Sequence, residues 1–264
     1  MSGDPQRWAD LRARALSAVV MVAVGSVEIW LGGLPFAVLV LVVMGAMVWE
    51  LARMTGPAVQ ARTPLLLAGL AVAALAGALW LPSDHAELLL ALPALGLALT
   101  RRRDRRIATL YGLGILAAGY GLIALRDLGI GALIWLVAVV VASDVLGYFA
   151  GRALGGPKFW PAISPKKTWS GTLAGWVGAA LVGLGFVLWG AAGWGLVLLS
   201  PVVAFAGQMG DIAESWIKRR CGFKDSSNLI PGHGGVMDRF DALIGAAVMI
   251  MVLGLVMPLP LPGG

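Results

Sequence analysis

Hydrophobic residues are arranged along the chain in nine segments that short polar stretches separate. A helix needs about 17–25 mainly apolar residues to cross a bilayer. Eight segments reach that length, and they cover residues 15–31, 34–50, 64–81, 107–125, 129–149, 171–190, 193–213 and 239–258. The ninth, 86–99, is shorter and contains Pro93. The pattern predicts an all-α integral membrane protein with about nine transmembrane helices.

The distribution of Lys and Arg favours a full span, rather than a re-entrant segment, for residues 86–99. Cytoplasmic loops of membrane proteins are enriched in these two residues. With nine spans and a cytoplasmic N-terminus, every one of the 20 Lys and Arg residues except Arg126 falls in a cytoplasmic segment, namely 1–14, 51–63, 100–106, 150–170 or 214–239. Without the ninth span, the last two basic segments would lie outside. We therefore predict a cytoplasmic N-terminus and an external C-terminus.

Composition agrees with a membrane protein. Hydrophobic residues make up 59% of the 264 residues and charged residues 13%, whereas a soluble domain typically carries about 25% charged residues. The net charge of +6 would also fit a nucleic-acid-binding protein, but its concentration in alternate loops favours membrane topology, and we expect no nucleic-acid partner. The one cysteine, Cys221, excludes an internal disulfide and a cysteine-rich metal site.

The pattern predicts one polytopic membrane domain over residues 1–264, because no soluble domain, repeat or long linker interrupts it. N-terminal helices fill about 15–125, and the part from about 129 to 258 contains the polar cytoplasmic loops 150–170 and 214–239. The first apolar run also fits a cleaved signal peptide, since basic residues precede it. We expect a retained helix, because a second apolar run follows at once and no small-residue cleavage site stands out.

Acidic side chains stand inside or at the ends of predicted helices. A charge at membrane depth costs free energy and normally faces a bundle interior or a water-filled cavity. Asp144, near the end of the sixth predicted span, is either a ligand in such a cavity or a headgroup-level residue that reaches water. The spacing of four further residues places them on one helical face: Asp211, Glu214, Ser215 and Lys218. Such pairs also stabilise ordinary helix surfaces, but this face continues an apolar helix, so we expect it to line a site.

Two more carboxylates, Asp238 and Asp241, lie one turn apart at the start of the last predicted span. They repel each other unless a cation lies between them or one takes up a proton. Oxygen ligands suit a hard cation such as Mg²⁺, and the chain has no His/Cys cluster of the kind that zinc prefers. We therefore predict a magnesium site formed by Asp211, Asp238 and Asp241, with Asp144 as a fourth candidate.

Cations and glycines accompany these acids. The cations are Lys166, Lys167, Lys218, Arg219, Lys224 and Arg239. Carboxylates that hold Mg²⁺, with cations around them, are what phosphoryl or nucleotidyl transfer requires. The PGHGG sequence at 231–235 fits either a plain turn or a loop whose backbone N–H groups approach an anion. His233 alone fits a hydrogen-bonded structural residue, and SPKKT at 164–168 a basic turn, but beside the acids both are better interpreted as phosphate-binding.

The sequence SWIKRRCGFKDSSNLIPGHGGVMDRFD, residues 215–241, resembles the signature of the phosphatidate cytidylyltransferases, also called CDP-diacylglycerol synthases. The letters that match at the family's spacing are Ser215, Lys218, Arg219, Lys224, Asp225, Pro231, His233, Gly234, Gly235, Asp238, Arg239 and Asp241. Upstream matches are GD at 210–211, SD followed by Tyr148 and GR at 151–152, and SPKKT. One departure is Ser170, where the family often has Glu. The strong resemblance covers about 143–171 and 207–241.

The resemblance implies an integral membrane enzyme that joins CTP to phosphatidic acid and releases CDP-diacylglycerol and pyrophosphate. It also implies dependence on Mg²⁺, alone or with a second cation, a homodimer, and a multi-pass location in the inner (plasma) membrane with the active site facing the cytoplasm. Expected catalytic residues are Asp211, Asp238, Asp241, Lys218 and Arg219. Expected substrate-binding residues are Ser164, Lys166, Lys167, Thr168, Ser215, Lys224, His233, Gly234, Gly235 and Arg239.

Other functions fit parts of the pattern. A polyprenol kinase or a cytidylyltransferase for a different lipid would share the metal and basic residues, and product analysis separates them, since a kinase releases CDP and a cytidylyltransferase releases pyrophosphate. A transporter would place its polar residues near the bilayer midplane, whereas here they gather on one side of the membrane. A scaffold role explains none of the acids.

Overall fold

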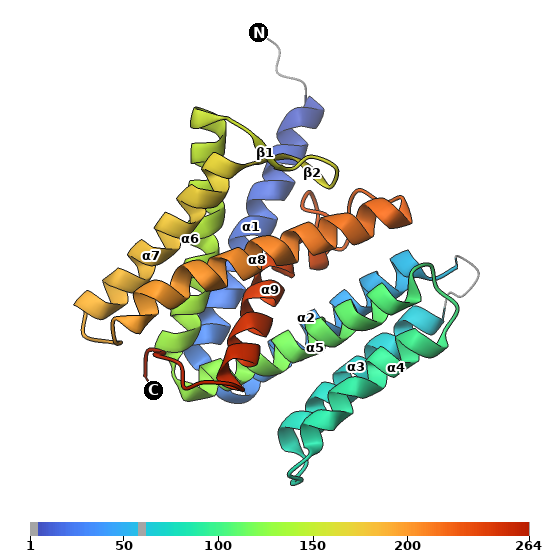
Figure 1. The fold of residues 1–264 in the computed structure, drawn as a ribbon. Helices are drawn as coiled ribbons and strands as arrows, with labels where there is room; N and C mark the ends of the chain where they lie inside the picture. The colour runs from blue at the N-terminus through green and yellow to red at the C-terminus, as the bar shows by residue number, and fades with distance from the viewer. Residues whose placement is uncertain (1–4, 58–61, 264) are drawn as a thin grey trace. The chain divides into compact units, whose positions relative to one another are not determined.

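The computed structural model describes residues 5–57 and 62–263, with side chains described from residue 14 onward. Within these residues the chain is mainly helical (Figure 1). The helices are α1 (Pro5–Leu31), α2 (Gly33–Thr55), α3 (Thr63–Trp80), the 3₁₀-helix η1 (Ala86–Leu90), α4 (Ala91–Leu99), α5 (Arg105–Leu128), α6 (Ile130–Leu154), α7 (Trp169–Leu188), α8 (Gly195–Cys221) and α9 (Met237–Gly254). Each of the nine predicted apolar segments is therefore mostly helical, as expected.

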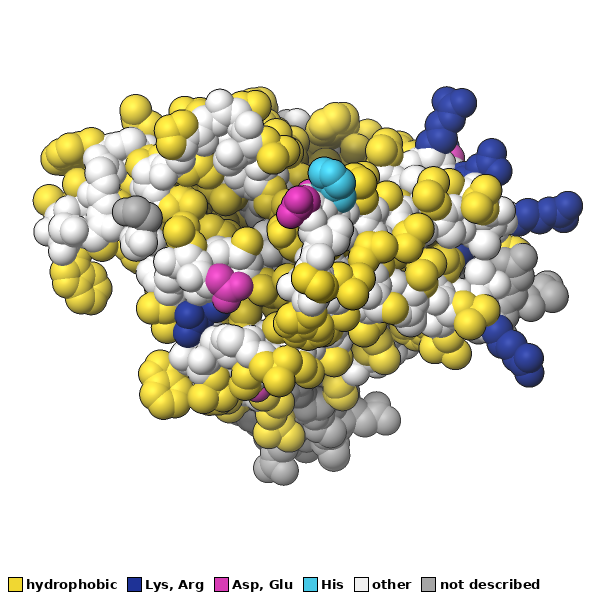
Figure 2. Space-filling model, turned by 90° about the horizontal axis from the view of Figure 1, so that it is seen from below, with side chains coloured by type: hydrophobic (Ala, Val, Ile, Leu, Met, Phe, Trp, Pro, Cys, Tyr) yellow, Lys and Arg dark blue, Asp and Glu magenta, His cyan; other side chains and the backbone are white. Residues whose placement is uncertain are grey.

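Seven of the described helices are long and apolar enough to cross a membrane: α1, α2, α3, α5, α6, α7 and α8. The segment Ala86–Leu99 is apolar but shorter, and α9 carries three charged residues in its first five positions. Large hydrophobic side chains are exposed on the helices, including Leu66, Trp189 and Leu198. Figure 2 shows that hydrophobic side chains are spread widely over one face of the protein. Soluble proteins seldom expose apolar surface on this scale, so the chain is a multi-pass membrane protein.

The chain divides into two compact units. Unit 1 consists of Met1–Gly112 and Cys221–Phe240, and unit 2 of Leu113–Arg220 and Asp241–Gly264. The polar stretch 221–240 therefore packs with the N-terminal helices. No local sequence pattern marks this contact between segments so far apart in the chain.

In unit 1, helix α2 supplies most of the buried core, with Met47, Val48 and Leu51 inaccessible to solvent. Helix α3 packs against α2, η1 and α4. The basic segment that follows α4 contacts the C-terminal end of α2, where Arg102 Nη1 donates to the Ala52 carbonyl at 2.7 Å. The same carbonyl accepts from Gly56 N at 3.1 Å, so Arg102 is a second donor that holds the basic segment against the end of the helix.

In unit 2, helices α6 and α7 lie side by side (Figure 1). Their backbones approach closely because small residues face each other, and a Cβ on Gly171 would overlap the Gly147 carbonyl. Small residues at helix contacts are the usual means of close packing in lipid. Helix α8 joins α6 through a buried hydrogen bond of 3.0 Å from Trp135 Nε1 to Ser200 Oγ.

A short antiparallel hairpin between α6 and α7 was not predicted. Strand β1 (Lys158–Trp160) pairs with β2 (Ser164–Thr168), with Lys158 opposite Thr168 and Trp160 opposite Ser164. Strand β2 is the SPKKT sequence. The basic segment that the sequence pattern presents as a loop is therefore held by a backbone ladder directly before α7.

Candidate functional site

Asp211, in the C-terminal half of α8, is the centre of the charged group in unit 2. Its Oδ2 lies 2.5 Å from Lys167 Nζ, and its Oδ1 is 3.4 Å from Ser215 Oγ. Lys167 Nζ also donates to the Gln208 carbonyl at 3.3 Å. The sequence pattern places Asp211, Ser215 and Lys167 in one site, and the structure brings these three together.

The hairpin separates the two lysines that the sequence presents as a pair. Side chains of neighbouring strand residues point to opposite faces. Lys167 lies half-buried against Asp211, and Lys166 is exposed. Only one of the two lysines therefore reaches the charged group of α8.

The side chains of Thr168 and Ser170 form hydrogen bonds at the start of α7. Thr168 is buried, and its Oγ1 accepts a hydrogen bond of 3.2 Å from Gly171 N as the N-cap of the helix. Ser170 Oγ donates to the Gly155 carbonyl. Ser170, the position at which the sequence departs from the pattern that it resembles, thus ties the start of α7 to the end of α6.

Close packing of α8 and α9 brings Asp241 near Asp211. A Cβ on Gly210 would overlap the Asp241 carbonyl and would lie 3.1 Å from the Gly245 Cα, so the two backbones meet at these glycines. The negative charge of Asp211 acts on Asp241 and also on Asp144 of α6, and the positive charges of Lys218 and Lys167 oppose this repulsion. Three of the four predicted metal ligands therefore form one electrostatic group in unit 2.

A polar network around Gln208 was not predicted. Gln208 Nε2 donates to Ser143 Oγ at 3.1 Å, and Gln208 Oε1 accepts from Trp176 Nε1 at 3.0 Å. These contacts connect α8 to α6 and α7 at the residue next to Asp144. Buried polar groups need partners, and here they fix the helices that carry the acids.

Lys218 and Glu214 form a buried ion pair one turn further along α8. Lys218 Nζ lies 2.6 Å from Glu214 Oε2, and the Glu214 side chain is fully buried. The expected helical stripe is present, but Glu214 offsets part of the positive charge of Lys218, which the sequence pattern assigns to substrate binding. Arg219, in the same last turn, is exposed.

The donor chemistry of these acids suits Mg²⁺, although no ready-made cage is present. Among the residues that the structure describes, no group of three or more His, Cys, Asp or Glu side chains is placed to hold a metal ion. Mg²⁺ usually binds through one or two carboxylates together with water and substrate phosphates. Two oxygen-bearing side chains from Asp144, Asp211 and Asp241 would meet that need.

The PGHGG sequence forms a tight turn in unit 1. Ile230 N donates to the Gly234 carbonyl at 2.8 Å, and His233 N donates to the Ile230 carbonyl at 2.9 Å. Gly232 and Gly234 have φ angles of 74° and 85°, a region that residues with a Cβ seldom adopt. Both glycines are therefore needed for the turn itself.

Asp238, the remaining predicted metal ligand, belongs to unit 1. Its Oδ2 accepts hydrogen bonds from Gly235 N at 2.7 Å and Ser226 N at 2.9 Å, and it lies 3.0 Å from Ser226 Oγ. The reach from Asp238 back to the N–H group three residues earlier resembles a capping box. The carboxylate thus has a defined orientation at the start of α9.

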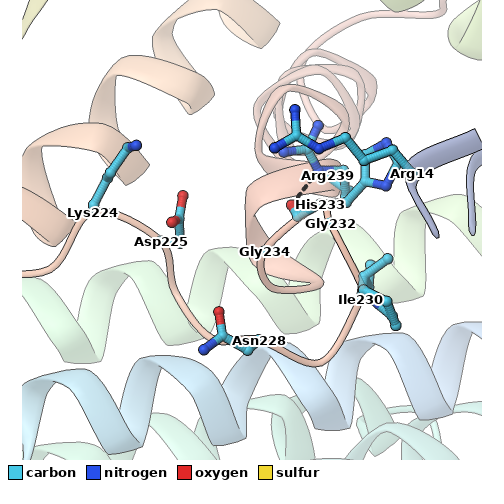
Figure 3. A pocket seen from close by; sticks show the side chains of 10 residues that line it. Arg14, Lys224, Asp225, Asn228, Ile230, Gly232, His233, Gly234 and Arg239 are labelled. Atoms are coloured by element: carbon cyan, nitrogen blue, oxygen red, sulfur yellow. Dashed lines mark hydrogen bonds between the residues drawn. The ribbon is translucent and has the colours of Figure 1, made fainter. Parts of the chain in front are cut away.

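A pocket of about 430 Å³ opens beside the glycine turn (Figure 3). Its lining consists of Arg14, Lys224, Asp225, Asn228, Ile230, Pro231, Gly232, His233, Gly234 and Arg239. Three cations and one carboxylate face it, so the pocket favours an anion. The sequence pattern predicts Lys224, His233, Gly234 and Arg239 for this role.

Arg14 is a member of the pocket that the sequence identifies only as a topology signal. Helix α1 is fixed to the turn because Ser17 Oγ lies 2.7 Å from His233 Nδ1 and donates to the Pro231 carbonyl at 3.0 Å. Arg14 precedes Ser17 by about one turn and lies against Gly232, where a Cβ would overlap the arginine side chain. Arg239 Nε holds the other side of the turn through the His233 carbonyl at 3.0 Å.

Replacing Arg14 by Gln is expected to weaken pyrophosphate binding by about five- to twentyfold, because one charge-assisted contact contributes roughly 1.5–3 kcal/mol less some screening by solvent. Titration calorimetry on detergent-purified protein measures this. Arg101→Gln, which alters an exposed arginine outside the pocket, is the matched control. Equal affinities of the two variants would remove Arg14 from the anion site.

Comparison with known proteins identifies the family. A profile of the Cytidylyltransferase family matches residues 12–257, almost the whole chain. The chain belongs to the cytidylyltransferase family. A protein named phosphatidate cytidylyltransferase from Brucella abortus biovar 1 (strain 9-941) is 34% identical over 260 residues, which cover 95% of this chain and 96% of the relative.

Further relatives of this cytidylyltransferase cover about half of it. Proteins with the same printed name from Helicobacter pylori (strain J99) and Staphylococcus saprophyticus are 43% identical over 148 residues and 37% identical over 131 residues. These matches span 53% and 48% of this chain, and 55% and 50% of the relatives. The resemblance seen in the signature at 215–241 is confirmed.

Proposed function

We propose that the protein transfers CMP from CTP to phosphatidic acid and releases CDP-diacylglycerol and pyrophosphate for phospholipid synthesis. The near full-length match to a relative named phosphatidate cytidylyltransferase carries this proposal. Two features of the chain support it: an anion-binding pocket beside a glycine turn and a group of carboxylates in unit 2. Both suit a substrate rich in phosphate.

In the proposed reaction, a phosphate oxygen of phosphatidic acid attacks the α-phosphorus of CTP. The new P–O bond forms as the bond between the α-phosphorus and the bridging oxygen breaks, and pyrophosphate takes the electron pair. The attacking oxygen is already an anion at neutral pH, so a strong general base is unnecessary. The protein must therefore hold the groups in line and relieve charge repulsion.

The side chains fit this task through charge. Lys218, Arg219, Lys224 and Arg239, with Lys166 and Lys167, are proposed to neutralise the triphosphate and the lipid phosphate, and Ser164, Thr168, Ser215, His233, Gly234 and Gly235 to position them. Lys167 is held against Asp211 at 2.5 Å, and this contact keeps its ammonium group at a fixed place. The backbone N–H groups of Gly232 and Gly234 are proposed as further donors, because those of His233 and Gly235 already donate to the Ile230 carbonyl and to Asp238.

We include Mg²⁺, alone or with a second cation, in the proposal. Asp211, Asp241 and Asp144, and separately Asp238, would supply its protein ligands. When bound, the cation offsets charge on the phosphate oxygens. We also propose that the protein has nine spans, with a cytoplasmic N-terminus and an external C-terminus. It would lie in the inner membrane with its site facing the cytoplasm, and it would form a homodimer.

To test the proposal, detergent-purified protein is incubated with phosphatidic acid, α-labelled CTP and Mg²⁺. Label is expected in the lipid fraction, with one pyrophosphate released for each label incorporated, and EDTA is expected to reduce the rate by at least about 100-fold. Restoration by excess Mg²⁺ controls for EDTA damage. Label that stays in water, with CDP released when a polyprenol is added, would establish a lipid kinase instead.

A further inference from the structure

Glu50 is a fully buried carboxylate in α2, inside an apolar helix that is long enough to span the membrane. A buried charge is retained only where hydrogen bonds or an opposite charge compensate its lost hydration. The partners of Glu50 are hydrogen-bond donors from the stretch 226–237, which lies 176 to 187 positions later in the chain. Neither the proposed reaction nor the signature sequence assigns a role to this residue.

Four donors converge on the two oxygens of Glu50. The backbone N–H groups of Val236 and Met237 donate at 2.8 and 2.7 Å. The hydroxyl groups of Ser226 and Ser227 lie at 3.1 and 2.5 Å. Glu50 thus satisfies N–H groups at the start of α9, which have no partner within the helix, with an internal anion at the positive end of the helix dipole.

The four donors lie at the two ends of the segment between Ser226 and Met237. One side chain therefore closes a loop of the chain, and the residues inside this loop include Asn228, His233 and Gly234 of the anion pocket. A second contact from α2 supports the same point, since Arg53 Nη2 donates to the Ser226 carbonyl at 3.4 Å. The shape of the pocket wall depends on α2.

The same network reaches Asp238. Ser226 Oγ lies 3.1 Å from Glu50 Oε2 and 3.0 Å from Asp238 Oδ2, so one hydroxyl group lies between the two carboxylates. Gly235 allows this arrangement, because a Cβ there would overlap both Ser226 Oγ and Glu50 Oε1. The second glycine of the GG pair is thus explained by the approach of Glu50.

We propose that Glu50 is a positioning residue: it touches no substrate, but it fixes the loop 226–237 in the conformation that binds the anionic substrate. The role of Glu50 in substrate binding rests on the proposed function, whereas its role in fixing the loop does not. A carboxylate accepts at both oxygens, whereas a glutamine amide presents one NH₂ group that opposes the donors. Glu50→Gln keeps the size of the side chain and removes this match.

The experiment compares wild type, Glu50→Gln and Glu87→Gln, an exposed glutamate in η1, in detergent. Hydrogen–deuterium exchange of peptides covering 228–237 is the first measurement, and pyrophosphate affinity by calorimetry the second. We expect Glu50→Gln to raise exchange of the Val236 and Met237 amides and to weaken pyrophosphate binding at least tenfold. Glu87→Gln should match wild type in both.

Turnover supplies the third measurement and separates positioning from simple loss of folded protein. The thermal midpoint and the folded fraction are monitored in parallel. For the folded fraction, Glu50→Gln should raise the KM for at least one of the two substrates, CTP and phosphatidic acid, at least tenfold. Glu50→Asp should recover part of the loss because it restores the charge. A lower rate per milligram with unchanged KM and pyrophosphate affinity would reduce Glu50 to a stabilising residue and overturn the proposal.

Three further outcomes bear on the role of Glu50. Unchanged exchange in Glu50→Gln overturns the fixing of the loop, whatever the activity. If Glu50→Gln does not fold, Ser227→Ala replaces it, since this variant removes one of the four donors; wild-type exchange and affinity in Ser227→Ala then count against the proposal. A wild-type protein without turnover contradicts the proposed function, while exchange and pyrophosphate binding still test Glu50.

Discussion

Asp211→Asn is expected to lower the rate of CDP-diacylglycerol formation by about 100- to 1,000-fold, the loss typical when one group that stabilises transition-state charge is removed. The change keeps the size of the side chain and removes the charge that Lys167 contacts at 2.5 Å. Because Gly210 and Gly245 make the adjacent helix contact, the packing of α8 against α9 should be unaffected. Initial rates with α-labelled CTP over a range of Mg²⁺ concentrations measure the effect.

The matched control for Asp211 is Asp84→Asn, at an exposed position before η1, which should retain the full rate. Asp238→Asn should lose turnover to a similar degree, since Asp238 Oδ2 accepts from two backbone N–H groups and its charge is lost. A normal thermal midpoint shows that the variants fold. Full activity in both Asp211→Asn and Asp238→Asn would falsify the metal assignment.

Gly235→Ala is expected to cost about 1–3 kcal/mol of stability, the usual penalty of an added methyl group in a tightly packed place, and to abolish detectable pyrophosphate binding. The new Cβ would occupy the space of Ser226 Oγ and Glu50 Oε1. One of the two must move, and the hydrogen bonds that close the 226–237 loop then break. Thermal unfolding in detergent and calorimetry with pyrophosphate measure the two effects.

Gly69→Ala is the control for this substitution. Gly69 lies in α3 of the same unit, and a methyl group added there would meet no atom within 4 Å. An alanine at this position should be neutral or slightly stabilising, because alanine favours the helix over glycine. If Gly235→Ala melts and binds like Gly69→Ala, the close approach of Glu50 to the loop is wrong.

The helices could be predicted because their signal is local. An apolar run of sufficient length identifies a membrane helix whatever surrounds it, and each such run contains a helix. The ends were less well predicted: α6 continues to Leu154, beyond the end of the predicted span at 149, whereas the continuation of α8 past 213 agrees with the polar face expected at 211–218. Apolar composition indicates the bilayer, whereas a helix continues into polar residues as long as its backbone hydrogen bonds do.

The hairpin at 158–168 could not be predicted in the same way. Its strands have three and five residues, and Pro165 stands in the second, where proline usually argues against a strand. The consequence for the site is direct, because strand geometry decides that Lys167 rather than Lys166 contacts Asp211.

Glu50, Arg14 and Gln208 were missed for another reason. Each one acts through partners far along the chain, and Glu50 meets Ser226 across 176 positions. A single sequence contains no sign of such a pairing. A glutamate inside an apolar run is the one available signal, because an intramembrane charge usually has a function.

The distance in sequence between Glu50 and its donors has a consequence for biosynthesis. At about 5–20 residues per second, the ribosome completes Ser226 roughly 10–35 s after Glu50. During that interval α2 has entered the bilayer with a carboxyl group whose permanent partners do not yet exist. We expect the nascent chain to keep this end of α2 at the water interface until then, so that the pocket is completed only when α9 is made.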